Sequence, residues 1–122
     1  MRLWHIDLIP KLPRQQLLGQ WREVWCAIGV LEKHGEINHS TVNYINEHPK
    51  YFLYAYGLVV ADEMLKRGYK PNRVDELTTP GAVEKYNDFM DGGSIIYPEH
   101  DDIYYQECID NLLGKGIDLR QK

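Results

Sequence analysis

The first residues of the chain and one charged pair on the following helix are the groups best suited to chemistry. Met1-Arg2-Leu3-Trp4-His5-Ile6 is a short apolar opening, and a turn bounded by prolines separates it from a helical pattern that carries Trp21-Arg22-Glu23. An α-amino group titrates at about 7.7–8.0, so an appreciable fraction is an unprotonated nucleophile near neutral pH. The order of these segments can bring the free amine close to the Glu23 carboxylate.

The same residues also fit plainer interpretations. An arginine next to a glutamate on a helix is more often a solvated or locally paired couple than a catalytic one. Tryptophans at positions 4, 21 and 25 favour packing in the core over stacking on bases. The basic side chains of Lys66, Arg67, Lys70 and Arg73 fit either a phosphate contact or a solvated helix end.

The spacing of histidines and cysteines does not predict a metal or redox site. A metal site would draw on His34, His39, His48, His100, Glu99, Asp101 and Asp102. These residues form no i, i+4 histidine pair and no compact ligand motif, so we predict no metal. Cys26 and Cys108 are far apart and each lies among helical apolar positions, which favours two buried thiols without a disulfide.

The first half of the chain is predicted to be helical. A stripe of apolar residues at three- and four-residue steps predicts a helix from about 13–14 to 32, formed by Leu17, Leu18, Trp21, Val24, Trp25 and Ile28. Asn38-His39-Ser40 offers side-chain caps for a short helix over 41–47, which His48-Pro49 ends. A third helix is predicted over 50–67, with one buried face made by Tyr51, Tyr54, Leu58, Ala61 and Leu65 and with Gly68 as its C-terminal cap.

The last third is predicted to hold two more helices. After a loop over 71–78, Thr79-Pro80 is a typical cap and first residue of a helix that reaches about Met90. Residues 91–94 form a turn and residues 95–98 an extended apolar segment that packs over the core. Asp101-Asp102 then caps a helix through Leu113. Because β-like runs are short and isolated, the fold class is predicted to be all-α.

Length and charge limit the remaining possibilities. With 122 residues, of which 43% are hydrophobic, the chain can bury one core and is predicted to be a single domain over 1–122. A net charge of −4 argues against a protein that coats nucleic acid. Most of the acidity lies in residues 84–122, which carry nine acidic and four basic side chains, so an anion site in the first two thirds stays possible. The absence of a long apolar run predicts a cytoplasmic, soluble protein without membrane contact.

Several motifs, taken in order and spacing, resemble the pyrimidine-dimer DNA glycosylase family, the endonuclease V type of repair enzyme known from phage. They are Met1-Arg2-Leu3-Trp4, Gln15-x-Leu17, Trp21-Arg22-Glu23, Leu31-Glu32-Lys33-His34-Gly35, Asn38-His39 and the helix end from Asp62 to Tyr69. The resemblance covers about residues 1–70, so the chain divides into a family-like core over 1–70 and an acidic helical extension over 80–122. The opening tetrapeptide is similar to a bacterial branch of the family.

The resemblance implies a compact helical bundle in which the first residues thread between helices and present the N-terminus at the active site. It implies that the α-amine attacks the sugar carbon of a damaged nucleotide in double-stranded DNA, displaces the base, forms a Schiff base and then cleaves the strand. No cofactor is implied. The residues it assigns to catalysis are Met1, Arg2 and Glu23, and those it assigns to substrate binding are Arg22, His5, Arg14, Lys33 and His34.

The chain departs from the family at three positions. A large residue, Arg2, follows Met1, which predicts that Met1 is retained and that its own amine acts from one residue farther out. The family's helix histidine falls at Gln16, and its second phosphate-binding arginine falls at Cys26. Two alternatives therefore stay open: a non-catalytic helical module that binds nucleic acid or protein, and a small-molecule enzyme that reuses the amine.

Overall fold

Four α-helices and three short 3-10 helices make up the regular structure of residues 1–120, the part of the chain that this computed structural model describes. The 3-10 helices are η1 (Ile6–Lys11), η2 (Asn43–Glu47) and η3 (Val74–Leu77). The α-helices are α1 (Arg14–His34), α2 (Lys50–Lys66), α3 (Pro80–Met90) and α4 (Asp102–Gly114). Residues 1–120 contain no strand, which confirms the predicted all-α class.

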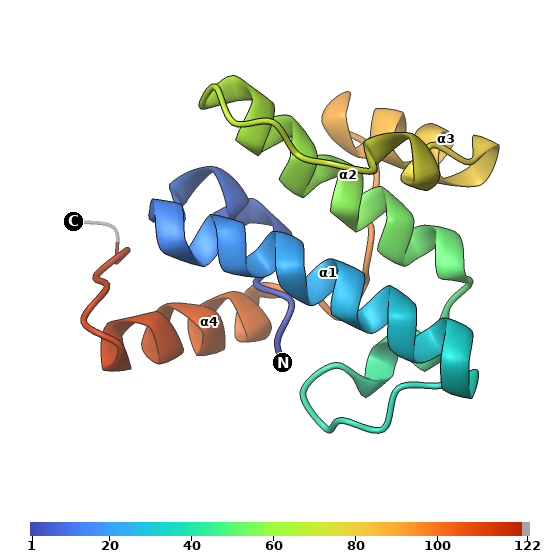
Figure 1. Cartoon of the computed structure of the whole chain (residues 1–122). Helices are drawn as coiled ribbons and strands as arrows, with labels where there is room; N and C mark the ends of the chain where they lie inside the picture. Colours follow the sequence, from blue (N-terminus) through green and yellow to red (C-terminus); the bar gives the residue numbers. More distant parts are fainter. Residues whose placement is uncertain (121–122) are drawn as a thin grey trace.

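The central helix is α2, which packs against α1 on one side and α3 on another (Figure 1). Gly57 allows the close approach of its neighbours, because a Cβ there would lie 2.8 Å from Cδ1 of Leu77 and 3.1 Å from Cγ1 of Val24. The predicted single buried face of α2 is wrong: Tyr51 is 38% exposed and Leu65 is 57% exposed. Since several elements surround the helix, its residues 55–61 are all buried, and no single stripe describes it.

Helix α1 follows the predicted apolar stripe, with Leu17, Trp21, Val24 and Ile28 buried. Gly35 ends it in the left-handed conformation at φ 78°, where its N–H donates to the carbonyl of Leu31. The short helix predicted over 41–47 is instead the 3-10 helix η2. Its N-cap is Val42, which provides no side-chain hydrogen bond, so residues 38–40 do not cap it.

The two predicted helix starts in the last third are confirmed. The hydroxyl of Thr79 accepts from the N–H of Ala82, and the carboxylate of Asp101 accepts from the N–H of Tyr104 at 2.8 Å. The segment over 95–98 packs over the core as predicted, with Ile96 and Tyr97 buried. These residues and Cys108 of α4 belong to the same hydrophobic core as the buried residues of 1–70.

The other predictions about single residues have different outcomes. Trp4 and Trp21 are buried. Trp25 is half-buried, and the guanidinium carbon of Arg73 lies 3.9 Å from the centroid of its ring. Cys108 is buried, but the prediction for Cys26 is wrong: its thiol is exposed because position 26 faces away from α2 and the core. Within residues 1–120 no group of three possible metal ligands occurs, and no helix there is long and apolar enough to cross a membrane.

Candidate active site

The backbone of the first residues is held by side chains from three helices. Gln20 of α1 accepts a hydrogen bond from the N–H of Trp4 at 2.6 Å, and its Nε2 donates to the carbonyl of Arg2 at 2.9 Å. Tyr56 of α2 donates to the carbonyl of Trp4 at 2.6 Å, and Tyr104 of α4 donates to the carbonyl of Leu3. The N-terminal segment therefore lies between α1, α2 and α4, whose side chains pair four of its backbone polar groups (Figure 1).

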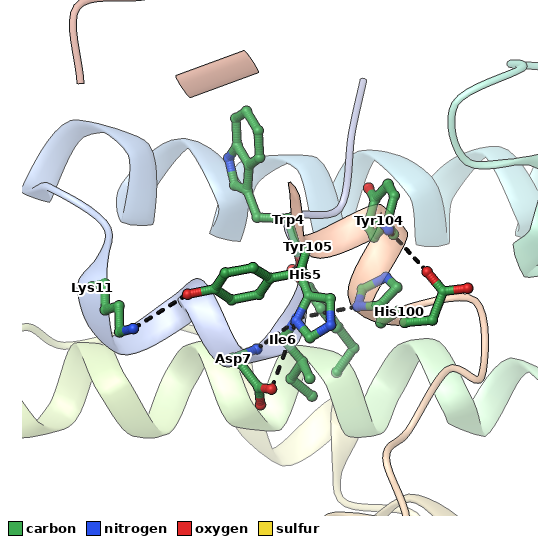
Figure 2. Close-up of polar contacts among 10 residues, drawn as sticks. Trp4, His5, Ile6, Asp7, Lys11, His100, Tyr104 and Tyr105 are labelled. Atoms are coloured by element: carbon green, nitrogen blue, oxygen red, sulfur yellow. Dashed lines mark hydrogen bonds and ion pairs between the residues drawn. The ribbon is translucent and has the colours of Figure 1, made fainter. Parts of the chain in front are cut away.

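A buried histidine also holds the backbone at the start of η1. His100 is 2% exposed and its Nδ1 accepts from the N–H of Ile6 at 3.1 Å (Figure 2). Because Nδ1 accepts, the proton of the neutral ring is on Nε2, which lies 2.8 Å from the hydroxyl of Tyr44. Burial, with a smaller contribution from neighbouring His5, lowers the pKa of His100 to about 3.

His5, which the sequence assigned to substrate binding, is placed in the core. It is 3% exposed, and its Nδ1 accepts from the N–H of Asp7 at 3.1 Å, so it caps η1 (Figure 2). Its ring meets the ring of Tyr105 edge-on at 5.1 Å. Burial lowers its pKa, although Asp7 opposes this shift. The side chain therefore caps η1 and is almost completely removed from solvent.

The N-terminus and Glu23 line one open pocket of about 390 Å³. Four residues of α1, at positions 16, 19, 20 and 23, form its wall because a helix places residues three and four apart on one face. The lining residues are Met1, Arg2, Trp4, Gln16, Gly19, Gln20, Glu23, His39, Thr41, Asn111 and Lys115. The structure thus brings together the predicted nucleophile and the predicted carboxylate.

The loop before η2 fixes the position of Met1 within this pocket. The hydroxyl of Thr41 donates to the carbonyl of Met1. The amine of Met1 lies 3.3 Å from Nε2 of His39. The N-terminal residue is therefore held at both its carbonyl and its nitrogen.

Arg2 and Arg22 take different roles at the edge of the pocket. The guanidinium of Arg2 lies 3.5 Å from the Glu107 carboxylate and close to the rings of Trp4 and Tyr104. Arg22 is exposed and its Nη2 lies over Gly19, 3.6 Å from where a Cβ would stand. Arg22 therefore presents its charge to solvent beside the pocket, whereas Arg2 is paired with α4.

The remaining predicted contacts lie at the two ends of α1 and do not line the pocket. Arg14 stacks on Tyr69, with 5.8 Å between guanidinium carbon and ring centroid. Lys33 and His34 are exposed in the last turn of the helix. At 1.5 Å per residue, Arg14 and His34 are about 30 Å apart, so the structure does not bring these residues together.

Sequence reasoning missed several lining residues, and one of them carried a readable signal. Gln20 is a single polar residue within the apolar stripe of Leu17, Trp21 and Val24, a pattern that indicates a buried polar group with a structural partner. His39 and Thr41 come from a loop, and Asn111 and Lys115 come from the end of α4. No local pattern places those four beside the N-terminus.

Chemically, the pocket combines a primary amine, a carboxylate and an imidazole with the cation of Lys115 at its rim. An amine with a neighbouring base can form covalent adducts with carbonyl or sugar carbons, and a carboxylate can stabilise positive charge on such an adduct. All of these groups belong to the chain itself. The arrangement therefore fits amine-based covalent chemistry on an electrophilic carbon.

Comparison with known proteins gives one match. The family model described as pyrimidine dimer DNA glycosylase matches residues 1–77, which is more than half of the chain and includes the N-terminal segment, α1 and α2. Comparisons with curated proteins and with solved structures gave no match. On the family match, which also extends the predicted resemblance past residue 70, the chain belongs to the pyrimidine dimer DNA glycosylase family.

Proposed function

We propose that this protein is a DNA-repair glycosylase with abasic-site lyase activity, acting on pyrimidine-dimer lesions in duplex DNA through its N-terminal amine. The observation that carries the proposal is the shared pocket of the Met1 amine and the Glu23 carboxylate. Membership of the glycosylase family supports the DNA substrate. The anchoring of residues 2–4 by three helices supports a fixed position for the amine, which catalysis by proximity requires.

In the proposed reaction, the neutral amine forms a bond to the sugar carbon that bears the damaged base. The electron pair of the carbon–base bond leaves with the base, which takes a proton from water. The amine nitrogen then loses one proton and uses its electron pair to form the C=N bond as the sugar ring opens; the ring oxygen keeps the electron pair of its broken bond to that carbon and takes up a proton, which gives a protonated Schiff base. Removal of a proton from the adjacent sugar carbon expels the 3′ phosphate by β-elimination, and water releases the amine.

Glu23 would stabilise the positive charge that develops on the sugar and on the Schiff base, and it would carry protons between the steps. The half-buried carboxylate projects from the wall of the pocket that Met1 also lines, so both act on the same bound atom. Arg22 would hold a phosphate next to the lesion, for which its planar set of donors is suited. The chemistry uses groups of the chain and water, without a metal or an organic cofactor.

The size of the pocket is compatible with one extruded nucleotide. Its volume of about 390 Å³ falls within the range of about 300–1,000 Å³ for ligand pockets. An enzyme that acts on the sugar of a paired nucleotide must take that nucleotide out of the helix. We therefore expect the damaged strand to lie along α1 with one nucleotide turned toward Met1.

The test is incision of an end-labelled duplex that contains one cyclobutane pyrimidine dimer. Wild-type protein should cut the damaged strand at the lesion and leave an undamaged duplex intact. Glu23→Gln should lower the rate of incision by at least about a hundredfold, in the range that loss of one acid–base group causes. Glu32→Gln, which removes an exposed carboxylate of the same helix outside the pocket, is the matched control and should cut like wild type.

Two outcomes would overturn the proposal. Tight binding to the damaged duplex without any incision would identify the non-catalytic binding module. No binding and no incision, with a pocket that accepts only small carbonyl compounds, would identify the small-molecule enzyme.

A further inference from the structure

We infer that His39 is the general base that deprotonates the N-terminal amine. The inference deepens the proposed function and rests on the amine being the nucleophile. His39 touches the reacting nitrogen: its Nε2 lies 3.3 Å from the nitrogen of Met1. A base within hydrogen-bond reach of the proton it removes satisfies the geometric requirement for this role.

The hydrogen bonds around Thr41 fix which nitrogen of His39 carries the proton. A hydroxyl has one hydrogen, and the hydroxyl of Thr41 donates it to the carbonyl of Met1, which can only accept. Nδ1 of His39 lies 2.9 Å from the same hydroxyl oxygen. Since that oxygen has no second hydrogen to give, Nδ1–H must donate to it. The lone pair of the neutral ring is therefore on Nε2, which faces the amine.

The loop that carries His39 is held on both sides. The side chain of Asn46 binds both the N–H and the carbonyl of Ile37, at 2.8 and 2.7 Å. Buried Val42 donates its N–H to the carbonyl of His39 at 3.0 Å. His39 itself is exposed, so a proton that it accepts can pass directly to solvent. A general base that acts in repeated turnovers needs a fixed backbone and a side chain that solvent can reach.

In the step assigned to His39, its Nε2 takes one proton from the α-ammonium group and becomes an imidazolium. The amine nitrogen keeps the electron pair of the broken N–H bond and uses it to bond the sugar carbon. The pair of the carbon–base bond leaves with the base, and the imidazolium returns its proton to water. The same Nε2 then removes the next proton from nitrogen before the Schiff base forms.

Other charged groups face the same pocket and contribute to its electrostatics. These are the cations of Arg2, which pairs with Glu107, and of Lys115, and the carboxylate of Glu23. Side chains of these three types ordinarily titrate outside pH 6–8.5, whereas imidazoles and α-amines titrate inside it. A change of reaction rate across that interval that depends on residue 39 therefore reports on His39 and the amine.

The experiment measures the rate of covalent trapping by cyanoborohydride on a duplex with one abasic site, from pH 6 to pH 9.5. We expect His39→Ala to be slower than wild type by about tenfold or more at pH 6.5–7. The difference should shrink above pH 8.5, where hydroxide deprotonates α-amines without help. Added imidazole should restore part of the rate to His39→Ala. Ser40→Ala, which changes the exposed neighbour of His39 in the same loop and does not line the pocket, is the matched control and should behave like wild type.

A second readout needs no DNA. Arylation of the amine by fluorodinitrobenzene, quantified by mass spectrometry of the N-terminal peptide, should show the same dependence on His39 and on pH. If trapping fails in wild type while arylation still depends on His39, the proposed function is wrong and the base assignment stands. If His39→Ala matches wild type in both assays, or is slowed equally at every pH without rescue by imidazole, the base assignment is wrong.

Discussion

The side-chain amide of Gln20 binds the backbone around Trp4 as a neighbouring strand would. Its oxygen lies 2.6 Å from the nitrogen of Trp4, and its nitrogen lies 2.9 Å from the carbonyl oxygen of Arg2. The residue is 1% exposed, so this pairing occurs away from water. Because Glu23 comes three residues later on α1, the same helix sets the positions of the N-terminal segment and of the carboxylate.

Replacing Gln20 should therefore affect stability and chemistry together. Gln20→Leu leaves the N–H of Trp4 without its partner, and each buried group left unpaired costs about 1–3 kcal/mol. We expect urea unfolding to show a loss in this range and Schiff-base trapping to slow. Gln16→Leu changes the same residue type one turn earlier, at a half-buried position, and should change stability by no more than about 0.5 kcal/mol. Equal stability of the two variants would contradict the account.

Arg22 should contribute to binding of damaged DNA through one phosphate. Removal of one phosphate contact lowers the slope of log affinity against log salt by about 0.9. We expect Arg22→Ala to show this decrease in fluorescence anisotropy titrations at several salt concentrations. Lys50→Ala removes the same charge from the first residue of α2, outside the pocket, and should leave the slope unchanged. An unchanged slope for Arg22→Ala would remove Arg22 from the DNA contact.

Acid should destabilise the fold through His100. Its pKa in the folded protein, about 3, lies below the ordinary value of 6.5. Between these two pH values the unfolded chain therefore binds more protons than the folded protein. The stability that neutral His100 provides is complete above pH 6.5 and is lost as the pH falls toward 3. Between pH 7.5 and 5.5 this one group should account for about 1 kcal/mol of the free energy of unfolding. Buried His5, whose pKa is also lowered, acts in the same direction.

Urea unfolding at several pH values checks this prediction. His100→Gln should remove most of the dependence between pH 7.5 and 5.5, because glutamine does not titrate. His34→Gln, which replaces an exposed histidine, should leave the dependence of stability on pH as it is in wild type. A wild-type stability that stays constant over this interval would show that His100 is not buried in its neutral form.

Local signals in the sequence predicted most helix boundaries. The capping residues Thr79 and Asp101 and the left-handed Gly35 and Gly68 act over a few residues, so their effects can be read without the fold. The buried face of α2 could not be read in this way. The prediction of one stripe assumes one packing partner, whereas residues 55–61 of this helix are enclosed by several elements.

The candidate site was predictable in part for the same reason. Glu23 and the N-terminus were identified from a resemblance that follows the order of motifs. His39, Thr41 and Lys115 reach the pocket from distant positions, and their contacts depend on the path of the whole chain. The hydrogen bond from Tyr104 to the carbonyl of Leu3, which are 101 residues apart, is the extreme case, because only the folded arrangement of α4 against the N-terminal segment creates it.

Two glycines in helices should respond in opposite ways to alanine. Gly57→Ala places a Cβ 2.8 Å from Leu77 and should destabilise the protein by about 1–3 kcal/mol, as overpacking does. Gly29 of α1 has no atom within 4 Å of such a Cβ, so Gly29→Ala should stabilise it by about 0.5–1 kcal/mol. Thermal unfolding of both variants measures the signs. A neutral Gly57→Ala would contradict the close packing of η3 and α1 on α2.

The claim that the α-amine of Met1 is the nucleophile is tested most directly by borohydride trapping on a duplex with one abasic site, followed by peptide mass mapping. The account predicts a covalent adduct on the N-terminal peptide that begins with Met1, and its loss when the same protein carries an N-terminal acetyl group. An adduct on a lysine such as Lys115, or no adduct from protein with an intact and unblocked N-terminus, would contradict it.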